Sequence, residues 1–234
     1  LVNVKLPNNF KIVITGHGRV GGGAMEIINK LGLKEVNSPE FLIKDFNEPV
    51  FTQLAVDEYN AKADGSNFSK ADFYTDPSNF VSTFNQYAPI ADMYIACHYW
   101  DSEAPYIFTR DDAKAKNWNI KIVADISCDI DCAIASTLRP STITDPLYGY
   151  NPITESEDDF MKEGVIGVMA VDNLPCELPL DASVDFGEMF LEHVLEPLIG
   201  NDPDDIIGRA SETKNGQLTE HFAYLRNYVD GTVA

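Results

Sequence analysis

The sequence predicts an α/β fold, with a doubly wound, mostly parallel sheet and helices on both faces. Short apolar runs rich in β-branched residues alternate with segments of helical period along the chain. This alternation is typical of parallel sheets built from βαβ units. The run at residues 165–171 is almost wholly apolar, as expected for a strand that helices cover on both sides.

The opening of the chain gives the clearest local pattern. Residues 10–15 indicate a buried strand, and residues 24–31 carry apolar side chains at helical spacing and end at Gly32. We expect a second strand at residues 41–45. Residues 46–77 are polar and without a clear period, so they are predicted to be a long loop with one helical piece near residues 52–62.

The rest of the chain returns to regular alternation. Further strands are expected at residues 92–97, 121–126 and 165–171. Further helices are expected at about residues 78–87, 109–116, 180–199 and 218–228. Residues 127–164 are predicted to be irregular.

A glycine motif lies between the first strand and the first helix. Gly16-His-Gly18-Arg-Val-Gly21 matches G-x-G-x-x-G in the strand–turn–helix context that gives the motif meaning. Gly16 permits a tight turn, Gly18 allows backbone to approach a pyrophosphate, and Gly21 allows close helix–strand packing. The helix N-terminus would then bind phosphate. The motif predicts a Rossmann-type dinucleotide site, and a glycine turn without a ligand is the alternative.

An acidic residue follows the expected second strand. Asp45 lies 24 residues after Gly21, near the position where this fingerprint places an acid that binds the adenosine ribose. A carboxylate there would repel a 2′-phosphate, so Asp45 favours NAD over NADP. The alternative is an aspartate that only caps a turn.

The charge and the cysteines exclude several classes of protein. Seventeen basic and 37 acidic residues give a net charge of −20, which argues against a nucleic-acid partner. No apolar run is long enough for a membrane span, and no signal peptide opens the chain. Four scattered cysteines indicate a reduced, cytoplasmic compartment. Cys128 and Cys132 have no second pair nearby, so no metal site is predicted.

Several polar and aromatic residues follow the expected strands, where ligands bind in open α/β sheets. His98 could act in acid–base chemistry, although a plain loop histidine is the more common case. Tyr99 could pack against a cofactor or against the core. Asp125, Asp129 and Asp172 could orient a substrate, and capping of the following loops is the alternative for each.

Two longer stretches carry a family resemblance. Ile122-Val-Ala-Asp-Ile-Ser-Cys-Asp-Ile-Asp131 and Val171-Asp-Asn-Leu-Pro-Cys-Glu-Leu-Pro179 resemble the saccharopine dehydrogenase family. The match is to its lysine–2-oxoglutarate reductase-like branch, within the alanine dehydrogenase and transhydrogenase group. With the glycine motif it extends over roughly residues 10–200. The chain resembles the C-terminal, cofactor-binding half of such an enzyme.

The resemblance implies roles for individual residues. The residues that would contact the cofactor are Gly16, Gly18, Arg19, Val20, Gly21, Asp45, Tyr99, Ile126, Asn173 and Leu174. Asp172 would face the catalytic groups, and Asp129 falls where alanine dehydrogenases place an active-site aspartate. Alanine dehydrogenases have an uncharged residue at the position of Asp172, so this acid favours the saccharopine branch.

The resemblance also implies a function and a missing part. Residues 1–200 would form the NAD-binding domain, and residues 201–234 a helical segment that returns to an N-terminal domain absent before Leu1. That domain supplies the family's catalytic lysine and histidine, so we expect this chain alone to bind NAD and catalyse little. The implied reaction is hydride transfer at a C–N bond, which interconverts a secondary amine and an imine and links lysine with 2-oxoglutarate.

Other functions remain open at this stage. An alanine dehydrogenase-like enzyme would make a primary amine, and a non-catalytic NAD-sensing module would bind dinucleotide without turnover. The partners expected for the enzyme are an amino acid or 2-oxo acid, the missing domain of the same chain and, as a possibility, a second copy of the chain.

Overall fold

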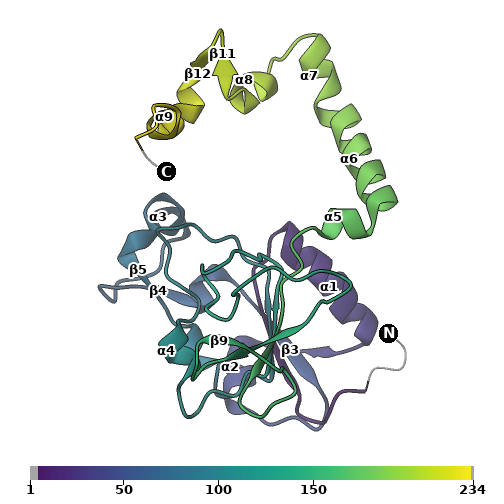
Figure 1. Cartoon of the computed structure of the whole chain (residues 1–234), viewed down its shortest axis with the longest axis vertical. Coiled ribbons are helices and arrows are strands. Elements are labelled where there is room, and N and C mark those ends of the chain that lie inside the picture. Colours follow the sequence, from purple (N-terminus) through teal and green to yellow (C-terminus); the bar gives the residue numbers. More distant parts are fainter. Residues whose placement is uncertain (1–4, 233–234) are drawn as a thin grey trace. The chain divides into compact units, whose positions relative to one another are not determined.

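The computed structural model describes residues 5–232, so Leu1 lies outside the described range. The chain forms two compact units, Leu1–Asn173 and Leu174–Ala234 (Figure 1). The domain boundary expected at residue 200 falls inside the second unit, between α7 and α8. The two units are described separately below.

The first unit is built on one large sheet of eight strands. Six neighbouring strands run parallel, and the last two pair antiparallel at one side. In spatial order the strands are β2 (Lys34–Glu35), β3 (Val50–Leu54), β1 (Lys11–Thr15), β6 (Met93–Ala96), β7 (Ile122–Asp125), β10 (Ile166–Met169), β8 (Tyr148–Asn151) and β9 (Ser156–Asp158). The mostly parallel α/β sheet predicted from the sequence is therefore confirmed.

Apolar side chains cover both faces of this sheet, because alternate residues of a strand point to opposite sides. Ile12 and Ile14 of β1 belong to the cluster that contains Ile28 of α1 (Arg19–Leu31). Val13 belongs to the larger cluster on the other face, which includes Phe41 of α2 and Ala113 of α4. Figure 1 shows α1 apart from α2 (Ser38–Ile43) and α4 (Arg110–Ala113), with the strands between them. Helices on both faces are confirmed.

Most of the predicted strands and the first helix are present. The strands expected at residues 10–15, 92–97, 121–126 and 165–171 correspond to β1, β6, β7 and β10. Helix α1 ends as predicted, since Gly32 adopts the left-handed conformation with φ 69° and its N–H bonds the Asn29 carbonyl. The helix expected at residues 109–116 is the shorter α4.

The second strand was predicted in the wrong place. Residues 41–45 are not a strand: Ser38–Ile43 form α2, which Asn37 caps by accepting a hydrogen bond from Glu40 N–H at 2.9 Å. Pro39 in the first turn also favours a helix start. The strand beside β1 is β3, which pairs with β1 over all five of its residues.

The long loop predicted at residues 46–77 and the helix predicted at residues 78–87 are also wrong, although the helical piece expected near residues 52–62 is present as a 3₁₀ turn. The region of residues 52–62 contains the end of β3, a short 3₁₀ turn η1 (Val56–Glu58) and β4 (Asn60–Lys62). The region of residues 78–87 forms β5 (Phe80–Ser82), which pairs with β4, between the 3₁₀ turns η2 (Pro77–Asn79) and η3 (Phe84–Gln86). Between the two regions lies α3 (Lys70–Thr75). The buried aromatic side chains here follow tertiary packing and not a helical period.

The second unit consists of short elements after one longer helix. Its members are α5 (Leu174–Glu177), α6 (Pro179–His193), α7 (Leu195–Ile199), α8 (Ile206–Ala210), β11 (Thr213–Lys214), β12 (Gln217–Leu218), η4 (Glu220–Leu225) and α9 (Arg226–Val229). The helix expected at residues 180–199 is thus present as α6 and α7, separated at Val194. Across the described chain, every helix is too short or too polar to cross a bilayer.

Candidate dinucleotide site

The topology of the sheet places a cavity at one of its edges. Strand β1 lies between β3 and β6, and the chain crosses from one side of β1 to the other between them. Ligands bind at such a switch point, outside the carboxyl ends of the strands. A cavity of about 480 Å³ lies there, and the loops after β1, β3 and β6 line it together with α3. Its lining residues are Gly16, His17, Gly18, Ala55, Val56, Asp57, Tyr59, Lys70, Phe73, Tyr74, Cys97, His98 and Tyr99.

The first and third glycines of the motif are required by close packing. Gly16 adopts φ +98°, and a Cβ there would meet the Cys97 carbonyl oxygen at 2.5 Å. A Cβ on Gly21 would meet the Gly16 carbonyl oxygen at 2.2 Å. That oxygen also accepts a hydrogen bond from Gln53 Nε2 at 2.8 Å. The turn therefore folds only with glycine at both positions.

Gly18 differs from these two glycines because nothing lies within 4 Å of the position of its Cβ. Gly18 is the N-cap of α1 and makes no side-chain cap, so the first N–H groups of the helix are left for another acceptor. The open space and the free donors fit a pyrophosphate lying against the backbone. Arg19 and Val20 follow in the first turn, and both are exposed.

Asp45 does not lie at this edge of the sheet. It lines a different cavity together with Phe10, Lys11 and Asp92, which stand at the beginnings of β1 and β6. Its carboxylate accepts a hydrogen bond from Asn9 Nδ2 at 3.2 Å. Parallel strands of five residues separate the two edges by roughly 15 Å. The prediction that Asp45 accompanies the glycine motif is corrected, because the residues around it form α2 and not the strand beside β1.

Asp57 occupies the position that the fingerprint assigned to Asp45. It follows β3, the neighbour of β1, and lines the same cavity as Gly16 and Gly18. Its side chain is exposed, and within the described residues no donor bonds its carboxylate. The signal for Asp57 was present in the sequence as the run Val-Phe-Thr-Gln-Leu at residues 50–54 followed by an acid. The polar composition of residues 46–77 obscured it.

His98 is buried and not a plain loop histidine. Its side chain is only 7% exposed, and burial lowers its pKa to about 4. Nδ1 lies 2.9 Å from Thr15 Oγ1, which in turn lies 2.9 Å from the Tyr94 hydroxyl. Nε2 is buried and has no partner within the described part of the chain. Burial thus keeps the ring neutral near pH 7, and an acid–base role for His98 stays a prediction.

Tyr99 and Ile126 occupy different environments. Tyr99 lines the cavity and is 80% exposed, so its ring is free to contact a ligand. Ile126 is partly buried after β7 and packs against the apolar cluster beneath α1. Both residues lie at the carboxyl edge of the sheet.

Asp129 and Asp172 both lie close enough to Cys128 for their charges to act on its thiol. Burial raises the pKa of the Cys128 thiol, and the carboxylates of Asp125, Asp129 and Asp172 raise it further. These acids follow β7 and β10, two and three strands away from β1 in the sheet. At a strand spacing of about 4.8 Å this is roughly 10 to 15 Å from the glycine turn. Both Asp129 and Asp172 are exposed.

Asp125 has a structural role in the same region. It is fully buried and accepts hydrogen bonds from Ser127 Oγ at 2.5 Å, Cys128 N at 3.1 Å and Thr137 Oγ1 at 2.6 Å. Its carboxylate thereby holds the loop that carries Asp129. The capping interpretation therefore applies to Asp125.

The remaining predicted residues fall at the junction of the two units. Asn173 is the last residue of the first unit and is exposed. Leu174 is the first residue of the second unit and begins α5. Among the described residues no cluster of three or more His, Cys, Asp or Glu side chains could hold a metal ion.

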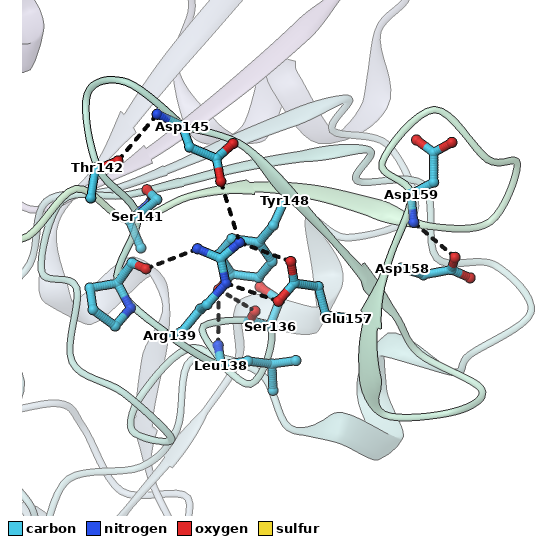
Figure 2. A network of polar contacts seen from close by, with 12 residues as sticks. Ser136, Leu138, Arg139, Ser141, Thr142, Asp145, Tyr148, Glu157, Asp158 and Asp159 are labelled. Atoms are coloured by element: carbon cyan, nitrogen blue, oxygen red, sulfur yellow. Dashed lines mark hydrogen bonds and ion pairs between the residues drawn. The ribbon is translucent and has the colours of Figure 1, made fainter.

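A polar network fixes the chain beyond Asp125. Figure 2 shows Arg139 at its centre, with its guanidinium paired to Glu157 Oε1 at 2.8 Å and Oε2 at 2.9 Å. The guanidinium also lies over the Tyr148 ring, 4.6 Å from its centroid. The Tyr148 hydroxyl donates to the Ser136 carbonyl at 3.1 Å. Arg139 thus connects Glu157 of β9 with Tyr148 of β8, and Tyr148 in turn bonds the loop at Ser136, so the network anchors both strands to that loop.

Comparison with known proteins gives relatives but no matching family model. The chain is 28% identical over 237 aligned residues to an alpha-aminoadipic semialdehyde synthase of Arabidopsis thaliana. The alignment covers 91% of this chain and 22% of that protein. It is 26% identical over 248 residues to the mitochondrial alpha-aminoadipic semialdehyde synthase of Rattus norvegicus, covering 92% of this chain and 26% of that protein. The Mus musculus protein of the same name is 25% identical over 244 residues.

These relatives confirm the resemblance to saccharopine dehydrogenase-like proteins that the sequence motifs indicated. The chain spans about a quarter of the length of the curated relatives it matches.

Proposed function

Starting from its similarity to alpha-aminoadipic semialdehyde synthases, we propose that this chain is the dinucleotide-binding part of a saccharopine dehydrogenase-like amino acid oxidoreductase. The observation that carries the proposal is one cavity that combines the open backbone at Gly18 with the exposed carboxylate of Asp57. The first suits a pyrophosphate and the second suits a ribose diol.

The bound group is a nicotinamide dinucleotide. The N–H groups of the first turn of α1 donate to its phosphates, and Gly18 leaves room for them. Asp57 replaces Asp45 as the acceptor for the adenosine ribose hydroxyls. Tyr99, with its exposed ring, packs against the cofactor. When bound, the cofactor supplies the hydride chemistry.

The cofactor is NAD in this proposal. A carboxylate at the ribose repels a 2′-phosphate, so Asp57 disfavours NADP. Lys70 also lines the cavity and is the cation that would oppose this preference. Its ammonium lies 5.8 Å from the centroid of the Tyr74 ring. The balance between Asp57 and Lys70 therefore determines the discrimination between NADH and NADPH.

The substrate side of the reaction involves Asp129 and Asp172. Both carboxylates lie at the carboxyl edge, beyond the glycine turn, where the nicotinamide end of an extended dinucleotide would reach. They would orient the amine or imine of an amino acid substrate. The reaction interconverts a secondary amine and an imine and links lysine with 2-oxoglutarate. The acid–base pair would come from a further domain of the same enzyme.

The remaining expectations stay predictions. Localisation in the cytoplasm is one of them, and two of the relatives are named as mitochondrial proteins. Self-association of the chain is the other.

Fluorescence titration of the 234-residue chain with NADH, and in parallel with NADPH, tests the cofactor proposal. We expect saturable binding of NADH and much weaker binding of NADPH. Equal affinities for NADH and NADPH would contradict the role proposed for Asp57. Binding of neither dinucleotide would contradict the proposed site itself.

An enzyme assay on the full-length protein tests the reaction. NADH oxidation that requires both lysine and 2-oxoglutarate is expected. NADH oxidation with pyruvate and ammonia, and none with lysine and 2-oxoglutarate, would favour an alanine dehydrogenase-like enzyme instead.

A further inference from the structure

His98 carries a polar atom that the fold itself does not use. His98 lines the proposed dinucleotide cavity and is almost fully buried, yet its Nε2 has no hydrogen-bond partner in the described residues. Buried polar atoms in folded proteins nearly always have partners, so an exception in a residue that lines a cavity points to a missing ligand or water. Nε2 can donate a hydrogen bond only if it carries the proton of the neutral ring.

The hydroxyl groups of Tyr94 and Thr15 determine which nitrogen of the His98 ring carries the proton. Tyr94 is fully buried, and its hydroxyl has Thr15 Oγ1 as its partner at 2.9 Å. The tyrosine proton is used only if Tyr94 donates to Thr15. The Thr15 proton is then directed at His98 Nδ1, also 2.9 Å away. Nδ1 is thereby an acceptor, and the neutral ring carries its proton on Nε2.

The position of the ring relates this donor to the glycine turn. The Cβ position of Gly16 lies 2.9 Å from the His98 Cα, so the backbones of the two loops are in contact. The Tyr59 ring packs edge-on against the imidazole, with the two ring centroids 6.1 Å apart. The neutral Nε2–H of His98 would be a further hydrogen-bond donor beside the N–H groups in the first turn of α1, and it would add no positive charge to the site.

We infer that His98 is a cofactor-binding residue whose Nε2–H donates a hydrogen bond to an oxygen of the dinucleotide next to the glycine turn. The hydroxyls of Tyr94 and Thr15 act as positioning groups that fix the ring in this tautomer. The inference rests on the proposed function, because it requires a dinucleotide in the cavity.

Nitrogen NMR of the 234-residue chain tests the tautomer directly. In a chain labelled with ¹⁵N-histidine, we expect one of the four histidines to show a neutral ring protonated at Nε2, unchanged between pH 5.5 and 8. The His98→Gln variant assigns the signal. A ring protonated at Nδ1, or one that titrates in this range, would overturn the inference.

Addition of ligand to the same sample tests donation. Saturation with NADH should move the His98 Nε2 signal, and the probes ADP and adenosine separate a phosphate acceptor from a ribose acceptor. NADH that binds while the signal stays in place overturns this inference alone. Absence of NADH binding overturns the inference together with the proposed function, so the two failures are distinguishable.

Two substitutions give an independent readout of affinity. His98→Phe removes the donor and should weaken NADH binding by about fivefold to tenfold. His98→Gln keeps an amide N–H near the position of Nε2 and should stay within about threefold of the unsubstituted chain. Equal affinities for His98→Phe and the unsubstituted chain, both folded by melting temperature, would contradict the assignment.

Discussion

The two edges of the central sheet differ in how completely their polar groups are paired. At the amino edge, Lys11 Nζ donates to the carbonyl oxygens of Phe41 at 3.0 Å and Lys44 at 2.6 Å. Asp92 accepts from Lys11 N–H and from Lys121 Nζ, both at 3.0 Å. Asp45 joins this group, and its charge counteracts the lowering of the Lys11 pKa by burial.

At the carboxyl edge Asp125 is also fully paired, but the groups around the cavity are not. Gly18 faces open space, no donor in the described chain bonds Asp57, and the Nε2 of His98 is without a partner there. Among these groups only the His98 Nε2 is buried, and a buried polar atom without a partner indicates a ligand or a water molecule. Asp45 thus lines the cavity at the amino edge, whereas Asp57 lines the cavity at the carboxyl edge, where we propose the dinucleotide binds.

Substitution of Gly16 gives the largest expected effect on stability. Gly16→Ala would place a Cβ 2.5 Å from the Cys97 carbonyl oxygen, at φ +98°. We expect a loss of about 3–5 kcal/mol of unfolding free energy, measured by urea denaturation. Gly18→Ala is the matched control and should unfold within about 1 kcal/mol of the unsubstituted chain. Equal losses for the two variants would contradict the described turn.

His98 makes stability depend on pH. Its pKa is about 4 in the fold, against 6.5 when unperturbed, so the unfolded chain binds a proton before the folded chain does. The neutral ring's contribution is complete above pH 6.5 and is lost as pH falls towards 4, by about 3 kcal/mol in total. The groups that face the ring, Thr15, Tyr94 and Tyr59, do not titrate in this range.

Urea denaturation of the unsubstituted chain and His98→Gln at pH 7 and pH 4.5 measures this contribution. The loss of stability on acidification should be smaller in the variant. The same acid loss in both proteins would show that His98 is not buried as described.

Gly18→Ala should leave the fold intact but weaken cofactor binding. A methyl group in the open space beside the first turn of α1 would stand where the phosphate approaches. We expect NADH affinity to fall about tenfold, equivalent to about 1.4 kcal/mol, in a fluorescence titration. Unchanged affinity would indicate that the dinucleotide does not contact this turn.

The network around Arg139 should give the smallest effect. Arg139→Ala removes the pair with Glu157 and the contact with the Tyr148 ring (Figure 2). Because the guanidinium is partly exposed, we expect a loss of about 1 kcal/mol in urea denaturation. The exposed pair of Lys162 with Asp158 provides a control, and Lys162→Ala should change stability by less than about 0.5 kcal/mol. Similar values for both variants would mean that the network adds nothing beyond a surface pair.

The sequence predicted those parts of the site that depend on local pattern. The glycine motif, the strand before it and the helix after it follow from short-range spacing, and all are present. The acidic residue at this edge, Asp57, could not be predicted from local spacing, because its position depends on which later segment pairs with β1. Residues 41–45 carried an apolar run but also a helix start at Asn37, and the capping signal prevailed.

The environment of His98 could also not be predicted from the sequence. Its burial and its link to Thr15 join residues 83 positions apart, which no local pattern encodes. Likewise the placing of both Asp129 and Asp172 within reach of Cys128 depends on β7 and β10 being neighbours in the sheet. The family motifs indicated these residues, whereas residue spacing alone did not.

The central claim is that the acid of the dinucleotide site is Asp57 at the carboxyl edge and not Asp45 at the amino edge. Parallel NADH titrations of Asp57→Ala and Asp45→Ala test it most directly. We predict that Asp57→Ala weakens NADH about tenfold or more and reduces the discrimination against NADPH, while Asp45→Ala binds both like the unsubstituted chain. Loss of NADH binding in Asp45→Ala, with Asp57→Ala unaffected, would contradict the account.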